Sequence, residues 1–465
     1  MQLWVKDKHF YSSLLLIALP VVLQNMITIG VTVMDVYMVG KLGEVSLSAS
    51  SLAGNYLDLF IVLNLGIGGG AGVFIAQYWG NRDMDSIKKM IVIMSIICFS
   101  FALVFALLAI TVPAGIMNIY TNDSGVIEAG RIYLLWSTPT FFVHGLVMVL
   151  TLSLRSMGKV LIPFISTVVS FFVNIFFNWV FIFGNLGAPR LEIAGAALGT
   201  VLSRVVEAMI IGRYFFHGEK HLKFRLRDFA ISPKGLWRPF MKSGSPVIAS
   251  DSFIALGNNV ISVIMGHIGT AFVAAYAIVF PVMRLCNVAS IGLATAAAAL
   301  IGKTIGEGKS EEAQIQGYTC LILTFFTGLV AAALVLFLCP RIISAYDLSE
   351  EAYEIARQLI YAVSIIILFQ ATQCVLNKGI LRGGADTRFA MVSELLFMWT
   401  ISIPFGAISA FVWGCSPLVI YLIMKCDQFL KSCFSFWRFQ SRKWVHEVYN
   451  DVGKKENICL EVKDD

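Results

Sequence analysis

The sequence predicts an all-α membrane protein with twelve transmembrane helices, arranged as two pseudo-symmetric six-helix bundles that face a central cleft. Three observations lead to this fold class: an apolar composition, long uncharged segments along the whole chain, and a repeat that relates its two halves. Of the 465 residues, 58% are hydrophobic and only 14% are charged, whereas soluble domains carry about 25% charged residues. A water-soluble fold could not bury this much apolar surface, so we expect a lipid bilayer to cover it.

The apolar segments have the length that a membrane requires. A bilayer core of about 30 Å needs a helix of about 20 mainly apolar residues. Short alternating strands, as in a membrane barrel, are not evident in the sequence. Boundaries set by charges, glycines and prolines predict twelve spans, at residues 12–38, 46–78, 88–111, 126–154, 160–184, 193–215, 240–265, 271–303, 314–338, 351–380, 387–412 and 416–437.

The distribution of basic residues predicts the orientation. The longest hydrophilic connection, residues 213–242, holds eight lysines and arginines, and the other loops on the same side are also basic. By the positive-inside rule, we expect both termini to lie in the cytoplasm. The membrane that we expect the protein to span is a plasma membrane of the bacterial type. Topology thus explains the net charge of +6, and we expect no nucleic-acid partner. No small-x-small cleavage site follows the first span, so we expect it to remain as both signal and helix.

A shift of 226 residues aligns the two halves of the chain. It places Pro20 on Pro246, and a shift of 227 places Arg155 on Arg382. Each half has six spans, so both cross the membrane in the same sense and their pseudo-twofold axis runs along the membrane normal. The predicted parts are an N-terminal six-helix lobe, a cytoplasmic linker, a C-terminal six-helix lobe and a polar cytoplasmic tail, at residues 1–215, 216–239, 240–440 and 441–465.

A carboxylate stands near the end of the first span. Gln24, Thr28, Thr32 and Asp35 are spaced by four, four and three residues, so they share one face of a helix. A charge within the membrane costs several kcal/mol, so this face should meet water or protein rather than lipid. We interpret Asp35 as a proton- or cation-binding residue and the other three as the polar lining of a cleft.

The second half offers other candidates, because Asp35 maps onto Ile261 there. Asp251 and Asn258 share a face of span seven, and Glu394 lies about a third of the way into span eleven. We interpret them as a candidate second ion or substrate site. Further polar residues expected to line the cleft lie in span ten, at Gln370, Gln373 and Asn377.

Two pairs of opposite charges lie within the spans. Asp58 and Arg284 occupy equivalent depths in opposite halves, so they are a candidate inter-lobe charge pair, unless each has a local partner. Arg204 and Glu207 are three residues apart in span six, and we expect them to pair with each other in a structural role. Neither a catalytic constellation nor a metal-binding spacing of the cysteines is evident, so no enzyme activity, metal or cofactor is expected.

A series of motifs occurs in order along both halves: Pro20 to Gly43, "NLGIGGGAG" (64–72), "GNRD" (80–83), "LRSMGK" (154–159), "VNIFFNWVFIFG" (173–184), "AGAALGTVLSR" (194–204), "LRGGADTR" (381–388) and "WTISIP" (399–404). This ordered set resembles the MATE (multidrug and toxic compound extrusion) transporters. The resemblance covers nearly all of residues 10–440 and implies a secondary active antiporter, which exports amphipathic, often cationic compounds in exchange for H⁺ or Na⁺. It also implies that Asn174 and Asn178 of span five lie beside Asp35 and contribute to ion coupling.

The chain departs from the family in its second half. Where the NorM-type branch has a glutamate eight residues after the proline of span seven, this chain has Ile254. The aspartate of span ten in that branch is also not evident. The DinF-type branch has an aspartate at the position of Asn178, so the chain is closer to the NorM type in span five. The family's C-terminal ion site is therefore not transferable, and the choice between H⁺ and Na⁺ stays open.

The sequence thus predicts a multidrug efflux antiporter that works as a monomer by alternating access, with small amphipathic or cationic compounds and the bilayer as its partners. The main alternative is a flippase for lipid-linked precursors, which would need a basic cleft for pyrophosphate. Acidic residues outnumber arginines deep in the spans, which favours cationic cargo. A membrane enzyme or receptor would need a catalytic set or a sensing domain, and neither is evident.

Overall fold

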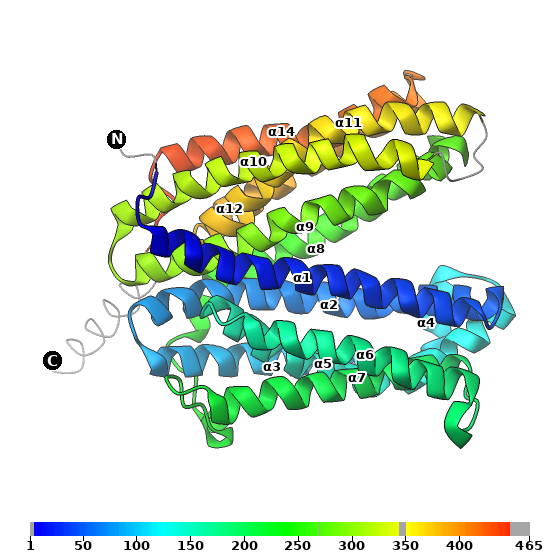
Figure 1. Cartoon of the computed structure of the whole chain (residues 1–465), viewed down its shortest axis with the longest axis horizontal. Helices are drawn as coiled ribbons and strands as arrows, with labels where there is room; N and C mark the ends of the chain where they lie inside the picture. The colour runs from blue at the N-terminus through cyan, green and yellow to red at the C-terminus, as the bar shows by residue number, and fades with distance from the viewer. Residues whose placement is uncertain (1–3, 269, 344–349, 447–465) are drawn as a thin grey trace. The chain divides into compact units, whose positions relative to one another are not determined.

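The computed structural model describes residues 4–268, 270–343 and 350–446, and most of these residues are helical (Figure 1). The α-helices in chain order are α1 (Lys8–Gly40), α2 (Glu44–Gly80), α3 (Met84–Thr111), α4 (Pro113–Tyr120), α5 (Ser124–Ser156), α6 (Leu161–Phe183), α7 (Ile193–Arg213), α8 (Trp237–Ile268), α9 (Thr270–Gly306), α10 (Ser310–Ile343), α11 (Glu350–Cys374), α12 (Thr387–Phe397), α13 (Ile403–Phe411) and α14 (Pro417–Gln440). The 3₁₀ turns are η1 (Asn185–Gly187) and η3 (Leu226–Ala230), and the π turns are η2 (Tyr214–Gly218), η4 (Val375–Leu381) and η5 (Met398–Ser402).

Each predicted span coincides with a long helical segment. Within the described residues, ten such segments are long and apolar enough to cross a membrane, which confirms a multi-pass helical membrane protein. Helices α8 and α14 are not among the ten. The middle of α14 carries Lys425, Asp427 and Lys431 within two turns, and these charges lower its hydropathy.

The ends of the helices follow from local side-chain chemistry. The carboxylate of Asp83 accepts the backbone N–H of Ser86 at 3.0 Å and so caps the start of α3. Asp123 caps α5 in the same way. Helix α6 ends at Gly184, whose φ of 76° lies in the left-handed region that glycine adopts without strain. These caps thus define the ends of the helices, close to the polar ends of the apolar segments.

The chain divides into two compact units. Unit 1 comprises the described residues of Met1–Val22, Ala76–Arg82 and Pro239–Asp465, and unit 2 comprises Leu23–Ile75 and Asp83–Arg238. Helices α1 and α2 each contribute to both units. The lobe boundaries taken from the sequence therefore stay a prediction, since this division places the first part of α1 and the last turn of α2 in unit 1.

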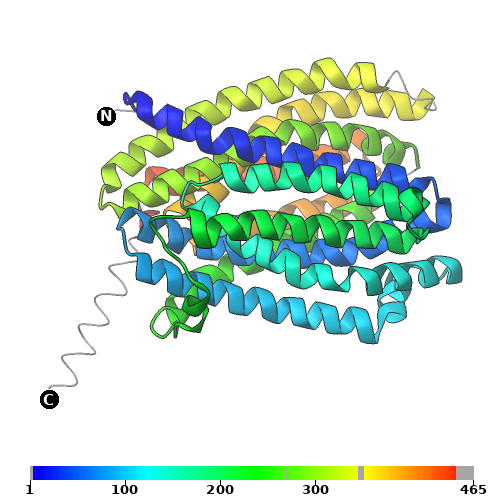
Figure 2. The ribbon, with the colours of Figure 1, turned by 60° about the horizontal axis from the view of Figure 1, so that its bottom comes forward.

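Unit 2 is built around aromatic side chains and close helix packing. Phe60, Phe105 and Phe141, from α2, α3 and α5, form a cluster with ring centroids 5.2–5.9 Å apart. A Cβ at Gly68 of α2 would overlap Leu152 of α5, so this glycine allows the close approach that packing in a membrane requires. Helices α5, α6 and α7 run alongside one another in both ribbon views (Figures 1 and 2).

Unit 1 includes part of the polar tail. Trp444 is fully buried, and its indole Nε1 donates a hydrogen bond to Gln314 Oε1 of α10 at 2.7 Å. The Gln77 side chain, from the end of α2, donates to the backbone oxygen of His446 at 3.0 Å. Residues 441–446 thus fold against unit 1, while the rest of the predicted tail lies outside the described residues.

Candidate functional site

Asp35 lies beside two asparagines of α6 in unit 2. Asn178 Nδ2 donates a hydrogen bond to Asp35 Oδ1 at 2.6 Å and approaches Asn174 Oδ1 at 3.3 Å. The two asparagines are one turn apart and buried, whereas Asp35 is partly exposed. The structure therefore brings together the three residues that the family resemblance associates with ion coupling.

This cluster keeps unused hydrogen-bonding capacity. Within the described part of the chain, Asn178 Oδ1 and Asn174 Nδ2 are buried without a hydrogen-bond partner. A buried polar atom left in this way costs about 1–3 kcal/mol, which calls for an explanation at this position. The amide oxygen of Asn178 also lies against Gly199 of α7, where a Cβ would overlap it. The site thus offers an amide oxygen and a carboxylate, which are suitable acceptors for a proton donor or a cation.

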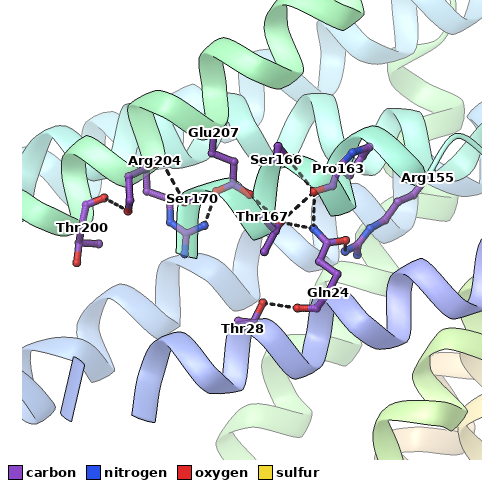
Figure 3. Close-up of polar contacts among 11 residues, drawn as sticks. Gln24, Thr28, Arg155, Pro163, Ser166, Thr167, Ser170, Thr200, Arg204 and Glu207 are labelled. Carbon is purple, nitrogen blue, oxygen red and sulfur yellow. Dashed lines mark hydrogen bonds and ion pairs between the residues drawn. The ribbon is translucent and has the colours of Figure 1, made fainter. Parts of the chain in front are cut away.

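Gln24, three turns before Asp35 on α1, belongs to a buried network (Figure 3). Its Nε2 donates to Thr167 Oγ1 of α6 at 2.7 Å, and Arg155 of α5 donates to its Oε1 at 2.5 Å. Thr28 and Thr32 are exposed, and each hydroxyl donates to a backbone oxygen one turn earlier in α1. The face that these residues share therefore divides into a buried end at Gln24 and an exposed part.

The pairing of Arg204 with Glu207, predicted from their spacing, is confirmed at 2.5 Å. Glu207 is buried, and its other oxygen accepts a hydrogen bond from Thr167 at 3.0 Å (Figure 3). Arg204 also interacts electrostatically with Asp35. The ion pair of span six and the Gln24 network thus form one connected polar region inside unit 2.

In unit 1, the carboxylate of Asp251 forms an ion pair with an arginine. Arg382 donates to its two oxygens at 2.7 and 3.2 Å, a bidentate pair. Asn258, the other candidate of span seven, is exposed two turns further along α8. Arg382 follows Asp251 by 131 residues, and in unit 2 Arg155 follows Gln24 by the same 131 residues. The pair with Asp251 is therefore the counterpart of a structural contact in the other half.

Glu394 lies in a second buried cluster of unit 1. Gln373 Nε2 and Asn377 Nδ2 donate to Glu394 Oε1 at 2.6 and 3.3 Å, so the structure joins polar candidates from spans ten and eleven. Gln370, one turn before Gln373, is half-buried. The cation of this cluster, which is not among the residues predicted from the sequence, is Lys431 of α14; its Nζ lies 3.6 Å from Glu394 Oε2.

A sequence signal for Lys431 does exist. Asp427 and Lys431 stand four residues apart, the spacing at which opposite charges pair on a helix. Their ion pair is 2.6 Å long and both side chains are buried. Charges in the last apolar span, read as a functional feature rather than as a loss of hydropathy, would have identified them.

The candidate inter-lobe pair stays a prediction. Asp58 of α2 belongs to unit 2 and Arg284 of α9 belongs to unit 1, and both residues are exposed.

Comparison with known proteins gives one consistent result. The MatE family model matches residues 20–180 and 246–408, and the two matches begin at Pro20 and Pro246, the prolines that the internal repeat aligns. Two similar relatives are each named "Probable multidrug resistance protein NorM". The Mesorhizobium japonicum protein is 26% identical, covering 88% of this chain and 89% of its own. The Thermotoga maritima protein is 25% identical, covering 93% and 92%.

Solved structures of similar fold agree with the family match. The eukaryotic MATE transporter AtDTX14 superposes with a TM-score of 0.82 at 16% identity, covering 96% of this chain and 99% of its own. A MOP superfamily transporter from Pyrococcus furiosus also gives 0.82, at 18% identity and with 92% and 95% covered. At these identities the likeness shows the fold.

Proposed function

Because the chain belongs to the MatE family, we propose that it is a secondary active multidrug efflux antiporter. It exports amphipathic, cationic compounds in exchange for H⁺ or Na⁺ by alternating access. The names of the NorM relatives support efflux of drugs, and the chain covers about nine tenths of their length.

The observation that carries the proposal is the environment of Asp35. Its hydrogen-bond donor is a neutral amide, Asn178, at 2.6 Å. An amide stabilises the carboxylate without neutralising it, so Asp35 can still bind a proton or a cation. A cationic compound and the coupling ion then compete for one charge, and the ion taken up from outside favours release of the compound.

The arrangement in the membrane is part of the proposal. We infer twelve spans, with α8 and α14 joining the ten apolar segments, both termini in the cytoplasm, and a monomer in the plasma membrane. The basic segment between α7 and α8 supports this orientation. Asn178, in place of an aspartate, supports a protein closer to the NorM type than to the DinF type.

The test is ethidium efflux from membrane vesicles under a pH gradient and a Na⁺ gradient applied separately. We expect one of the two gradients to drive efflux, and Asp35→Asn to reduce that efflux at least tenfold. The control is Asp85→Asn, an exposed carboxylate in the first turn of α3, which should leave efflux unchanged.

Full efflux by Asp35→Asn would exclude Asp35 as the coupling residue. No response of the unmodified protein to either gradient would exclude ion-coupled efflux of this cation and favour the flippase.

A further inference from the structure

Unit 1 contains a buried ion cluster, whereas Asp35 belongs to unit 2. The side chains of Glu394 on α12, and of Asp427 and Lys431 on α14, are at most 5% exposed. Lys431 Nζ lies 2.6 Å from Asp427 Oδ2 but 3.6 Å from Glu394 Oε2. The first distance is that of a charge-assisted hydrogen bond, and the second is too long for one. The ammonium group is therefore held by Asp427 and only loosely by Glu394.

The two oxygens of Glu394 differ. Oε1 accepts hydrogen bonds from Gln373 and Asn377, and Ser435 Oγ donates to Asn377 Oδ1 at 2.6 Å, which directs the amide nitrogen of Asn377 toward Glu394. Asn377 lies in the π turn η4, and such turns occur frequently at functional sites. Oε1 is thus fixed in place, and Oε2 is the oxygen that can take up a proton.

Three fully buried charges meet at Glu394. Glu394, Asp427 and Lys431 together carry one excess negative charge, and a buried net charge is costly; the half-buried Lys425, which interacts with Asp427, offsets part of it. Protonation of Glu394 leaves Asp427 and Lys431 as a neutral buried pair. Other charged groups act from the neighbouring elements: Arg382, which is paired with Asp251; Lys425 on α14, half-buried and interacting with Asp427 and Lys431; and the exposed Lys378 on η4.

The ammonium of Lys431 discriminates between possible cations. A metal ion at Glu394 Oε2 would lie beside this ammonium and be repelled by it. A proton instead forms a covalent O–H bond and leaves a neutral carboxyl group, so no second ion stands next to Lys431. The cluster is therefore suited to H⁺.

The internal repeat shows that the position of Glu394 carries a neutral side chain in unit 2. The shift of 227 residues that aligns Arg155 with Arg382 also aligns Thr167 with Glu394. Thr167 contacts Glu207 of the next span, as Glu394 contacts Lys431 of its next span. The contact recurs, but unit 1 has a carboxylate where unit 2 has a hydroxyl.

We propose that Glu394 is a second proton-binding site, with Lys431 as its built-in counter-cation, and that unit 1 takes up one proton per cycle in addition to the one at Asp35. The proposal rests on the proposed antiport. A proton from water forms an O–H bond at Glu394 Oε2, and Lys431 stays with Asp427. Two protons then enter for each monovalent cation that leaves, so one net charge moves inward and the membrane potential drives export. A potential of 100 mV adds about a fifty-fold gradient.

The test separates the two driving forces in proteoliposomes of the full chain, with ethidium as the exported cation. One set of vesicles has a pH gradient at zero potential, and the other has a potential at equal pH. We expect Glu394→Gln to lose at least tenfold of the potential-driven efflux while it keeps most of the pH-driven efflux. The matched control is Glu354→Gln, an exposed carboxylate on α11, which should change neither. A proportional loss of both would show a merely structural role and overturn the proposal.

A measurement on the unmodified protein does not depend on whether the variant folds. At a fixed pH gradient, the potential at which ethidium flux stops gives the number of protons exchanged per cation. Two protons support the second site, and one proton overturns it while leaving the antiport intact. Absence of ethidium transport under any gradient would overturn the antiport itself and this proposal with it.

Discussion

At the scale of single residues, the difference between the carboxylates lies in their partners. Asp251 is held by the guanidinium of Arg382 through both oxygens, and a competing cation would have to displace a fixed charge. Asp35 is held by an amide through one oxygen, and that oxygen can accept the bond whether or not the other carries a proton. The amide therefore positions Asp35 in both states.

This positioning depends on a glycine of α7. A Cβ at Gly199 would overlap Asn178 Oδ1, so Gly199→Ala should push the amide away from Asp35. We expect ion-driven ethidium efflux to fall about tenfold, measured in vesicles at equal protein amount. Gly212→Ala, in the same helix, is the control because its Cβ would meet only Phe216 at 4.0 Å, and alanine stabilises a helix relative to glycine by up to about 1 kcal/mol. Equal efflux by both variants would show that the orientation of Asn178 does not matter.

At the scale of helices, the sequence predicts where a helix occurs better than it predicts how that helix is rotated about its own axis. The bilayer dictates the length of each apolar segment, so the positions of the helices follow from the apolar runs and from the charges, glycines and prolines that bound them. The contacts of a side chain also depend on how its helix is rotated against neighbours. Gln24 and Thr28 share a predicted face, yet Gln24 is buried against α5 and α6 while Thr28 is exposed.

The π turns and the ion cluster illustrate the same limit. Asn377 reaches Glu394 from η4, and hydropathy contains no signal for a π turn. Lys431 of α14 contacts Glu394 of α12. The spacing of residues within one helix does not determine such a contact between two helices. The contact between Asp35 and Asn178 could be predicted, but only because the family resemblance, and not the spacing of residues, implies that span five lies beside span one.

The polar segment after α7 is anchored by a carboxylate outside the membrane spans. Glu219 is buried, and it contacts Lys159 and accepts the backbone N–H of His221 at 3.0 Å. Burial alone would raise the pKa of Glu219, but the hydrogen bonds from Lys159 and His221 outweigh it and hold the pKa below its ordinary value. The folded state thus binds fewer protons than the unfolded state, so this contribution to stability is present above the unfolded pKa and is lost as the pH falls through the folded one.

We therefore predict that Glu219→Gln lowers the stability of the purified protein at pH 7 by about 1–3 kcal/mol, because Lys159 loses its charged partner. The difference in melting temperature from the unmodified protein should shrink below about pH 4, near the ordinary pKa of glutamate. Glu128→Gln is the control, since its pair with Arg131 is exposed and such pairs contribute about 0–1 kcal/mol. A difference that is constant from pH 7 to pH 3 would contradict the role of the carboxylate charge.

At the scale of the whole molecule, the two halves repeat the contact of an arginine with the first span, but the partner of the arginine is neutral in one half and charged in the other. An arginine from the end of the fourth span bonds to the first span of its half in both units, 131 residues after its partner. The partner is the neutral amide of Gln24 in unit 2 and the carboxylate of Asp251 in unit 1. The repeat therefore fixes geometry, while substitutions within it decide which unit carries charge at each position.

This arrangement makes the two arginines unequal. Arg382→Met leaves Asp251, whose side chain is only 15% exposed, without its cation, and breaking a buried ion pair costs about 3–5 kcal/mol. Arg155→Met leaves a neutral amide acceptor, at about 1–3 kcal/mol. We expect the larger fall in melting temperature for Arg382→Met, measured in detergent by the reaction of the buried cysteines with a thiol dye. Adding Asp251→Asn to Arg382→Met should recover part of the loss, because it removes the unpaired charge. If the two single variants melted alike and the double variant recovered nothing, the charge of Asp251 would contribute nothing to the contact, and the repeat would act through shape alone.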